Sequence, residues 1–308
     1  MNNLFSGVKI LDCTRVFSWP FASRYFSDYW AEVLKIETER NYDEARKFSP
    51  IIWDKSLYFE ILNRWKKSLY IDFKKEKDLN LFYELVKDAD IFLENFSANV
   101  KNKLKINYEI LSKINSKLIY WSLNWYWENS DKKAYDSIIQ AESGFSSLSW
   151  IEEPMKNATA IIDAFSGTNL VLAVSSLLYK REKTGFWGFV NIPMIASGIQ
   201  LLEQNLTQTS INWKNPDFVW NWDNAIFPFG FFKAKDWNIS IAIWNEILWN
   251  NFKQTFLNNI KWDYNSNQER LNSKDFLKEE IEKKFSEFSI ENLSKLLTKW
   301  AKGQNCVL

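Results

Sequence analysis

The sequence has 308 residues, enough for one large or two ordinary domains with a sizeable core, so a disordered chain and a small disulfide-stabilised scaffold are excluded. Its 39 Lys and Arg residues balance 38 Asp and Glu residues, and a net charge of +1 gives no field that would recruit nucleic acid or an anionic membrane. Histidine is absent, which excludes mechanisms built on an imidazole, and two cysteines make neither a disulfide framework nor a Cys-rich metal site.

Strand-like and helical segments alternate through the first 123 residues. The expected strands are 8–13, 32–37, 68–73, 90–94 and 117–123, and the expected helices are 21–29, 79–86 and 108–114. This alternation predicts an α/β fold with a Rossmann-like, doubly wound parallel sheet. Ligands bind beyond the carboxyl ends of the strands in such sheets, which here means residues 14–17, 37–40 and 94–96.

Two longer helices are expected at 134–148 and 165–182, and shorter strands and helices follow from residue 216. We therefore predict a large domain over 1–195, a linker helix over 196–217 and a smaller α+β domain over 218–308. The longest apolar uncharged stretch, 170–179, is short of the roughly 20 residues that a membrane span needs, and residues 1–7 lack the features of a signal peptide. We expect a cytoplasmic protein that works without a membrane or nucleic acid.

Several segments carry motifs of one known family. They are 7–15 (GVKILDCTR), 28–37 (DYWAEVLKIE), 63–72 (NRWKKSLYID), 89–96 (ADIFLENF), 134–144 (AYDSIIQAESG), 161–167 (IIDAFSG), 179–185 (YKREKTG) and 220–235 (WNWDNAIFPFGFFKAK). The chain resembles the class III CoA-transferases, which include formyl-CoA transferase, the carnitine CoA-transferase type and the 2-methylacyl-CoA racemases. The resemblance implies the class III CoA-transferase fold and a CoA-transferase that uses acyl-CoA and carboxylic acid substrates without a metal.

The resemblance also implies an interlocked homodimer in which each chain threads the other. Residues 304–308 (QNCVL) resemble the segment just before the family chain returns to its large domain, so we expect the return segment to be missing here. An inactive, truncated fragment is therefore an alternative to an active transferase.

Asp163 stands at the family position of the catalytic carboxylate. The resemblance implies that it attacks an acyl-CoA to give an aspartyl anhydride, and then an aspartyl-CoA thioester. The amides of the helix N-terminus would keep the carboxylate ionised. The residues alone leave an alternative, since an Asp that opens a helix also serves as an N-cap.

Other residues fall on family positions that contact CoA, where cations suit its phosphates. Thr38 replaces an arginine of the family, and Arg40 is expected to substitute for it. Without the family resemblance, Asn95 would be interpreted as a cap at a strand end, and Lys103 and Lys133 as solvated side chains. The predicted CoA-binding residues are Val16, Phe17, Arg40, Asn95, Lys103, Lys133 and Tyr135.

Tyr135 and Asp136 separate two branches of the family. The racemases have a His-Asp pair here, whose His shuttles the α-proton, whereas this chain has Tyr at the first position. Because tyrosine with a pKa near 10 is a poor proton shuttle at pH 7, the transferase is favoured over the 2-methylacyl-CoA racemase, which stays as the alternative.

The chain has 17 Trp and only 8 Gly, where ordinary usage of about 7% would give about twenty glycines. Many family Gly positions hold Trp instead, and we expect that UGA codons meant as Gly were translated as Trp. Trp249 stands at a family Trp position and is expected to be genuine. A module that binds sugars or bases on tryptophan faces is an alternative, but these Trp residues are scattered over turns. The ten positions are Trp19, Trp30, Trp65, Trp125, Trp127, Trp150, Trp187, Trp220, Trp237 and Trp244.

Overall fold

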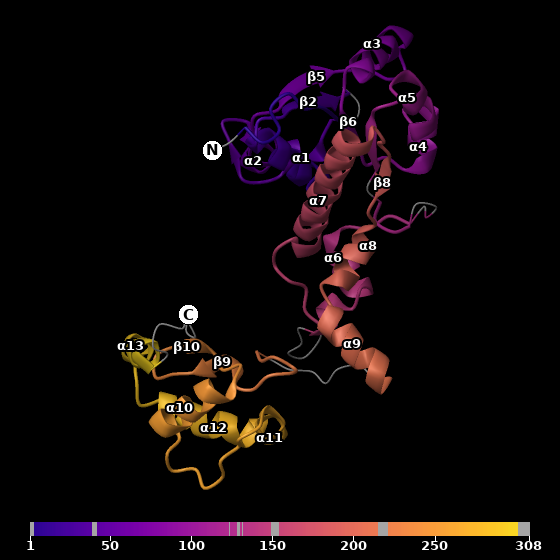
Figure 1. The fold of residues 1–308 in the computed structure, drawn as a ribbon. Coiled ribbons are helices and arrows are strands. Elements are labelled where there is room, and N and C mark those ends of the chain that lie inside the picture. Colours follow the sequence, from indigo (N-terminus) through magenta and orange to yellow (C-terminus); the bar gives the residue numbers. More distant parts are fainter. Residues whose placement is uncertain are drawn as a thin grey trace. The chain divides into compact units, whose positions relative to one another are not determined.

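The structure is a computed structural model that describes residues 3–38, 42–122, 124–127, 130, 132–148, 154–214 and 221–300, with the side chains of 298–300 excepted (Figure 1). The chain divides into two compact units. Unit 1 comprises Met1–Ser147 and Lys156–Gln204, and unit 2 comprises Leu148–Met155 and Asn205–Leu308. The segment that we predicted as one linker helix over 196–217 holds parts of two helices, α8 (Met194–Gln200) and α9 (Glu203–Asn212).

Unit 1 is built on a six-stranded parallel sheet in the order β5-β2-β1-β6-β7-β8. The chain adds strands outward from β1 to β2 and β5, then returns to the other side of β1 for β6, β7 and β8. This reversal confirms the doubly wound α/β fold, and it places a crevice at the carboxyl ends of β1 and β6. The strands are β1 (Lys9–Asp12), β2 (Glu32–Glu37), β5 (Lys67–Tyr70), β6 (Ile91–Glu94), β7 (Ile119–Ser122) and β8 (Phe189–Asn191).

Helices cover both faces of this sheet (Figure 1). Ile10 and Ile91 face a core shared with α1 and α7, whereas Leu11 and Phe92 face a core shared with α3 and α5. Strands buried on both faces explain the continuous apolar runs in the sequence. The helices of unit 1 up to the end of α7 are α1 (Ser18–Asp28), α2 (Leu57–Asn63), α3 (Glu76–Lys87), α4 (Ala98–Lys103), α5 (Tyr108–Ile114), α6 (Asp136–Glu142) and α7 (Ile161–Thr184), with 3-10 helices η1 (Glu44–Lys47) and η2 (Phe145–Leu148).

The helix predicted over 134–148 is wrong in extent. The α-helix α6 ends at Glu142, and Gly144 follows with φ of 88°, a left-handed conformation that interrupts the helix before η2 begins. A short hairpin of β3 (Ile51–Ile52) and β4 (Lys55–Ser56), together with α2, was not predicted.

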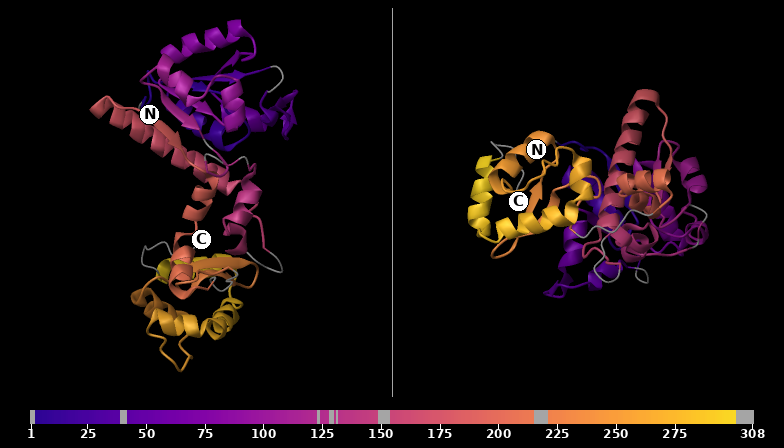
Figure 2. Two further views of the ribbon diagram at one scale, coloured as in Figure 1. Left: turned by 90° about the vertical axis from the view of Figure 1, so that its right-hand side faces the viewer. Right: turned by 90° about the horizontal axis from the view of Figure 1, so that it is seen from below.

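Helix α7 packs against α1 at Gly167. A Cβ atom at this glycine would lie 2.7 Å from the Ser18 carbonyl oxygen and 2.8 Å from the Phe21 ring, so only glycine allows the approach. The Ser18 hydroxyl donates a hydrogen bond of 2.8 Å to the carbonyl oxygen of Asp163. These contacts hold the first two turns of α7 against the start of α1. Figure 2 shows the long helix α7 from two further directions.

The predicted apolar stretch 170–179 is part of this longer helix. Among the described residues, α7 is the helix long and apolar enough to cross a membrane by length and composition, and 28% of its apolar window is buried. Leu170 and Val174 point into the core, whereas Leu172 and Tyr179 are each 67% exposed. The helix thus has one face in the core of unit 1 and an exposed face that carries Leu172 and Tyr179 beside polar residues, with the Lys183 ammonium 5.6 Å from the centre of the Tyr179 ring.

Unit 2 packs a two-stranded antiparallel sheet against helices. The sheet pairs β9 (Phe229–Lys233) with β10 (Asn238–Ala242). Buried aromatic side chains fill the core, and the indole of Trp249 is fully buried with its N–H donating to the Asp263 carbonyl oxygen at 3.1 Å. The helices after β10 are α10 (Glu246–Phe256), α11 (Asn267–Asn272), α12 (Lys274–Phe285) and α13 (Ile290–Trp300).

Two of the ten tryptophans expected at glycine positions have glycine-type backbone. Trp30 and Trp65 have φ of 75° and 65°, which costs free energy for any residue with a Cβ. Trp53 and Trp213, outside the ten, also have positive φ. Trp19, by contrast, lies inside α1 and is buried. Trp150 and Trp220 lie outside the described residues.

We predict that Trp30→Gly and Trp65→Gly each raise the free energy of unfolding by about 1–3 kcal/mol, because glycine removes the cost of the left-handed backbone. Trp237→Gly is the control, since Trp237 is 74% exposed and has no positive φ; it should leave stability unchanged or lower it. Denaturant unfolding of the three variants measures the difference.

In the gene, the codons of the ten tryptophans at family glycine positions should be UGA, and the codon of Trp249 should be UGG. Sequencing of the gene tests this, and UGG at most of the ten would contradict the decoding hypothesis.

Candidate active site

A cavity of about 530 Å³ opens at the carboxyl ends of β1 and β6. Its walls come from the loop after β1, the loop after β6, the segment before α6 and the first turn of α7. Six of the residues predicted from the sequence line it together, although they are spread over nearly 150 positions of the chain. They are Val16, Phe17, Asn95, Lys133, Tyr135 and Asp163.

The other two predicted binding residues are Lys103 and Arg40. Lys103, at the end of α4, is exposed and is not among the residues that line the cavity. Arg40 lies outside the described residues. Its neighbour Thr38 lines a second cavity described below.

Asp163 is the third residue of α7, and its carboxyl group is not the N-cap of that helix. The cap is supplied by Asp136, whose Oδ1 accepts the backbone N–H groups of Ile162 at 2.9 Å and Asp163 at 3.0 Å. Gln140 donates to the other oxygen of Asp136 at 2.5 Å. The N-cap alternative for Asp163 is therefore wrong, because a carboxylate 27 positions earlier in the chain already serves the first amides.

Asp163 is also less readily ionised than the sequence led us to expect. Burial raises the pKa of Asp163 to about 7, and the negative charge of Asp136 adds to the increase. The physical reason lies in the cap, since the amides that would favour an ionised Asp163 are bonded to Asp136 instead. Near neutral pH the buried carboxyl group is thus present in both protonation states, a property common at catalytic carboxyls.

Asn95 has one satisfied and one unsatisfied group. Its Nδ2 donates to the Arg15 carbonyl oxygen at 3.1 Å, whereas its buried Oδ1 has no hydrogen-bond partner among the described residues. Because a buried amide oxygen without a donor costs free energy, this oxygen is suited to accept an N–H from a molecule in the cavity.

Sequence reasoning missed two residues at the site. Arg15 lies in the loop after β1, pairs with Glu44 at 3.1 Å and lies over the Phe96 ring at 5.8 Å. Tyr58 contacts the Phe17 ring at 5.9 Å between ring centres, and burial and the charge of Asp163 raise its pKa. Arg15 sits inside the predicted ligand segment 14–17, so its position was a usable signal; Tyr58 comes from α2, which was not predicted.

A second cavity of about 160 Å³ adjoins the first through Arg15 and Phe96, which line both. Lys74 and Lys75 bring two further cations to it, and Tyr70 and Phe73 bring aromatic rings. Two carboxylates, Glu37 and Asp72, also line the second cavity, so its three cations leave a small excess of positive charge beside the aromatic rings. This composition suits an elongated ligand with phosphate groups and a planar ring at one end.

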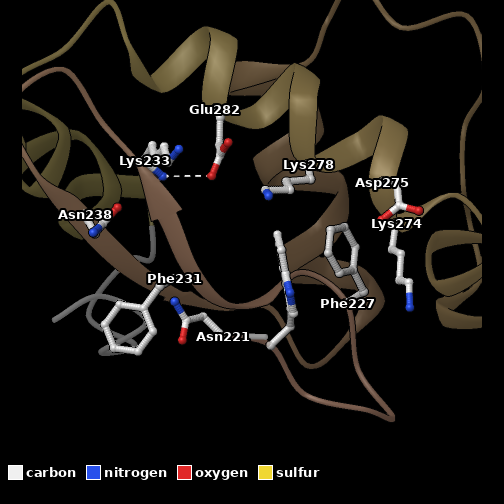
Figure 3. A pocket seen from close by; sticks show the side chains of 10 residues that line it. Asn221, Phe227, Phe231, Lys233, Asn238, Lys274, Asp275, Lys278 and Glu282 are labelled. Atoms are coloured by element: carbon white, nitrogen blue, oxygen red, sulfur yellow. Dashed lines mark hydrogen bonds between the residues drawn. The ribbon is translucent and has the colours of Figure 1, made fainter. Parts of the chain in front are cut away.

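A third cavity, of about 500 Å³, lies in unit 2 (Figure 3). Lys278 stands over the Trp222 ring at 4.8 Å, and the Glu282 carboxylate accepts the backbone N–H of Lys233 at 3.1 Å. None of the predicted site residues lines this cavity. Among the described residues of the whole chain, no group of three or more Cys, Asp or Glu side chains is placed to hold a metal ion.

Comparison with known proteins gives a family. Residues 5–302 match the sequence profile of CoA-transferase family III. The chain is 31% identical over 250 residues to the acetyl-CoA:oxalate CoA-transferase of Acetobacter aceti, covering 79% of this chain and 64% of that protein. It is 30% identical over 245 residues to the succinyl-CoA:glutarate CoA-transferase of Mus musculus, covering 78% and 56%.

The fold is shared with solved structures as well. A CAIB/BAIF family protein from Brucella suis superimposes with a TM-score of 0.83 at 25% identity, over 100% of this chain and 84% of that chain. The chain spans less than two thirds of the length of the two CoA-transferases named above.

We predict that the carboxyl group of Asp163 titrates near pH 7. Asp136→Asn should lower this pKa, because it removes the neighbouring charge and keeps an oxygen that can cap α7; the pKa should stay above the ordinary value of about 4, because burial is the larger cause. Carboxyl ¹³C NMR titration of both proteins measures the values. A pKa near 4 in the unsubstituted protein would contradict the burial argument.

Proposed function

This chain belongs to CoA-transferase family III, and we propose from that membership that it moves CoA from an acyl-CoA donor to a carboxylic acid acceptor. The observation that carries the proposal is a buried carboxyl group, Asp163, in a cavity lined by the residues expected to hold CoA. Six of the sequence-predicted residues line one cavity with Asp163 among them, and this proximity supports a role for Asp163 as the nucleophile in its ionised form. The activity itself stays a proposal that the experiments below test.

In the proposed reaction the ionised Asp163 carboxylate attacks the thioester carbonyl carbon. The C–S bond breaks, leaving an acyl–aspartyl anhydride and a CoA thiolate. The thiolate attacks the aspartyl carbonyl, which releases the acyl group as a carboxylate and leaves an aspartyl-CoA thioester. The acceptor carboxylate then attacks this thioester, which releases the CoA thiolate and leaves a second anhydride between the acceptor and Asp163. The thiolate attacks the acceptor's carbonyl carbon of this anhydride, which forms the new acyl-CoA and releases the Asp163 carboxylate.

The two adjoining cavities support an extended CoA. In the proposed arrangement the thioester end lies near Asp163, and the Asn95 Oδ1 accepts an N–H of the pantetheine arm. Arg15, Lys74 and Lys75 would meet the phosphates, and the aromatic lining of the second cavity would meet the adenine ring. Lys133, at the rim of the first cavity, would add a charge for phosphate or for the acceptor acid.

The substrates follow from the relatives only as a proposal. The names of the two relatives quoted above include oxalate and glutarate, which are both dicarboxylates. A dicarboxylate acceptor suits the cations Arg15 and Lys133 at this cavity, since a second carboxylate needs a positive partner. Acetyl-CoA and succinyl-CoA, tested against oxalate, glutarate and a monocarboxylate, form the appropriate first substrate panel.

The racemase alternative is disfavoured by the exposure of Tyr135. Its side chain is 67% exposed at the cavity rim, and its phenol is a poor proton shuttle at neutral pH. A racemase needs an acid–base pair on either side of the α-carbon, and Tyr135 is not suited to be one member.

We predict that Asp163→Asn abolishes CoA transfer while CoA binding persists, because the phosphate and pantetheine contacts lie on other residues. Steady-state transfer and calorimetric CoA binding give the two readouts, and hydroxylamine should trap an acyl group on Asp163 in the unsubstituted protein. Asp54→Asn, in the exposed β3–β4 turn, is the matched control and should keep full turnover.

Tyr135→Phe separates the branches in the same assays. A transferase should lose little activity, whereas a racemase would lose α-proton exchange into deuterated water. Near-normal transfer by Asp163→Asn would refute the nucleophile assignment.

We also propose that the protein forms a homodimer. Leu172 and Tyr179 lie seven residues apart on one face of α7, both largely exposed, and burial of such side chains contributes roughly 1.5–3 kcal/mol each. These two exposed side chains support a second chain as their cover, in line with the interlocked assembly that the family resemblance implies. The cytoplasmic location and the independence from membrane, nucleic acid and metal are proposals of the same kind, which cell fractionation and metal analysis would test.

We predict that Leu172→Glu shifts the protein from dimer to monomer, because a buried unpaired carboxylate opposes association. Light scattering coupled to gel filtration measures the mass. Leu81→Glu is the matched control, since Leu81 on α3 is 48% exposed and lies on the other side of the sheet; it should leave the mass unchanged. A monomeric unsubstituted protein at micromolar concentration would contradict the proposal.

A further inference from the structure

Val16 has a backbone conformation that its side chain opposes. Its φ is 76°, in the left-handed region, where a β-branched residue is a marked outlier. The residue lines the cavity that contains Asp163. A strained residue in a site wall persists only where its surroundings hold it.

The residue that holds Val16 is Asp43, from the segment that follows β2. Its Oδ1 accepts the Val16 N–H at 2.9 Å and the Ala45 N–H at 3.1 Å, so one oxygen joins the loop after β1 to the start of η1. Asp43 is fully buried. Glu37 at the end of β2 fixes Asp43 in turn, because its carboxylate accepts the Asp43 N–H at 3.1 Å.

Lys35 supplies the opposite charge. Its ammonium lies 3.1 Å from the second oxygen of Asp43 and donates to the Thr14 carbonyl oxygen at 2.7 Å. The side chain is only 2% exposed. The Asp43–Lys35 pair therefore holds the loop by hydrogen bonds to the backbone of two residues, Thr14 and Val16.

A second buried pair fixes the start of the same loop. The Asp12 carboxylate accepts the Thr14 N–H at 2.9 Å and contacts the Lys66 ammonium at 3.0 Å. Lys66 is 1% exposed and Asp12 fully buried. Four charged side chains are thus removed from water beneath a single turn of chain.

Stability alone is a poor reason for this arrangement. Burying charges is costly, and apolar residues of similar size often serve as well or better in a protein interior. The charges here do something that apolar residues cannot, since they bind the backbone N–H and carbonyl groups of the loop. Their targets lie next to Val16, the one strained residue among those that line the cavity.

We propose that Asp43, paired with Lys35, is a positioning residue that holds Val16 in the left-handed conformation and so presents a preformed cavity wall to acyl-CoA. The identity of the ligand as acyl-CoA rests on the proposed function. Asp43 acts through Val16 and is not itself among the residues that line the cavity. Because Asp43 already orders the loop, the binding of acyl-CoA does not have to supply the free energy of ordering it.

The test first removes the contacts of Asp43 and Lys35 with the loop, and then replaces Val16 by a residue that does not need those contacts. Lys35→Met with Asp43→Ala deletes both charges, leaves neither one buried without its partner, and should weaken acetyl-CoA binding by about tenfold or more. Adding Val16→Gly should restore most of the affinity, because glycine adopts a positive φ without the cost that Val pays. Asp43→Asn, which keeps an acceptor for the Val16 N–H, should retain more affinity than the double variant. Isothermal calorimetry with acetyl-CoA and with free CoA measures all four proteins.

Two further measurements keep the outcome decisive. Glu246→Gln breaks the pair with buried Arg270 in unit 2 and controls for general destabilisation, so it should leave acetyl-CoA affinity unchanged. Amide hydrogen exchange at residue 16 measures the protection of the Val16 N–H by Asp43 without any ligand. This amide should exchange faster in the double variant than in the unsubstituted protein.

The proposal is overturned if the double variant binds acetyl-CoA as tightly as the unsubstituted protein. It is equally overturned if Val16→Gly restores no affinity, since Asp43 then acts only through folding. If the unsubstituted protein binds neither acetyl-CoA nor CoA, the proposed function fails. Exchange at residue 16 then decides the positioning role, with unchanged protection in the double variant refuting it.

Discussion

The approach of α7 to α1 at Gly167 is the contact on which the candidate site depends. It places the first turn of α7 against the loop after β1, two segments separated by nearly 150 residues, and Ser18 links them through the Asp163 carbonyl oxygen. Because a side chain at Gly167 would collide with backbone, any substitution there would move Asp163 relative to Val16 and Phe17. Asp163, the proposed nucleophile, and the expected CoA-binding loop are therefore joined by packing, and the sheet beneath them only brings the two elements within reach.

The same packing sets the electrostatics of the site. It buries Asp163, while Asp136 occupies the amides that would otherwise favour its charge. A carboxyl group whose folded-state pKa is above its unfolded value binds its proton more tightly in the native state, so its contribution to stability is greatest at low pH and falls as pH rises from about 4 to about 7. Stability is lost in the pH range in which the nucleophilic form appears. A less hydrated carboxylate, with fewer water molecules to displace, is also better prepared to attack a thioester.

The sequence was most informative where regular patterns determine structure. The bounds of β2 and α5 agree with the predicted ranges 32–37 and 108–114, since these elements bury apolar side chains against a continuous core. The helix over 134–148 failed at Gly144, where a local left-handed residue overrides the periodicity. The family motifs located Asp163, but they said nothing of Asp136 as the cap, because that contact depends on how α6 meets α7. Lys35 and Asp43 were overlooked since charged residues in a sequence are expected at the surface, and burial becomes visible only with the partner in place.

Val16, Trp30 and Trp65 all have a left-handed backbone, but their surroundings differ. Val16 is held by buried charges that contact the backbone on both sides of it, so its conformation is supported by the structure around it. Trp30 and Trp65 have similar φ values, yet their indoles are 63% and 79% exposed, and packing contributes little to hold them there. Strain with dedicated support indicates a function at that position. Strain without support indicates that the residue is wrong for its backbone, which is the expected result if glycine belongs at positions 30 and 65.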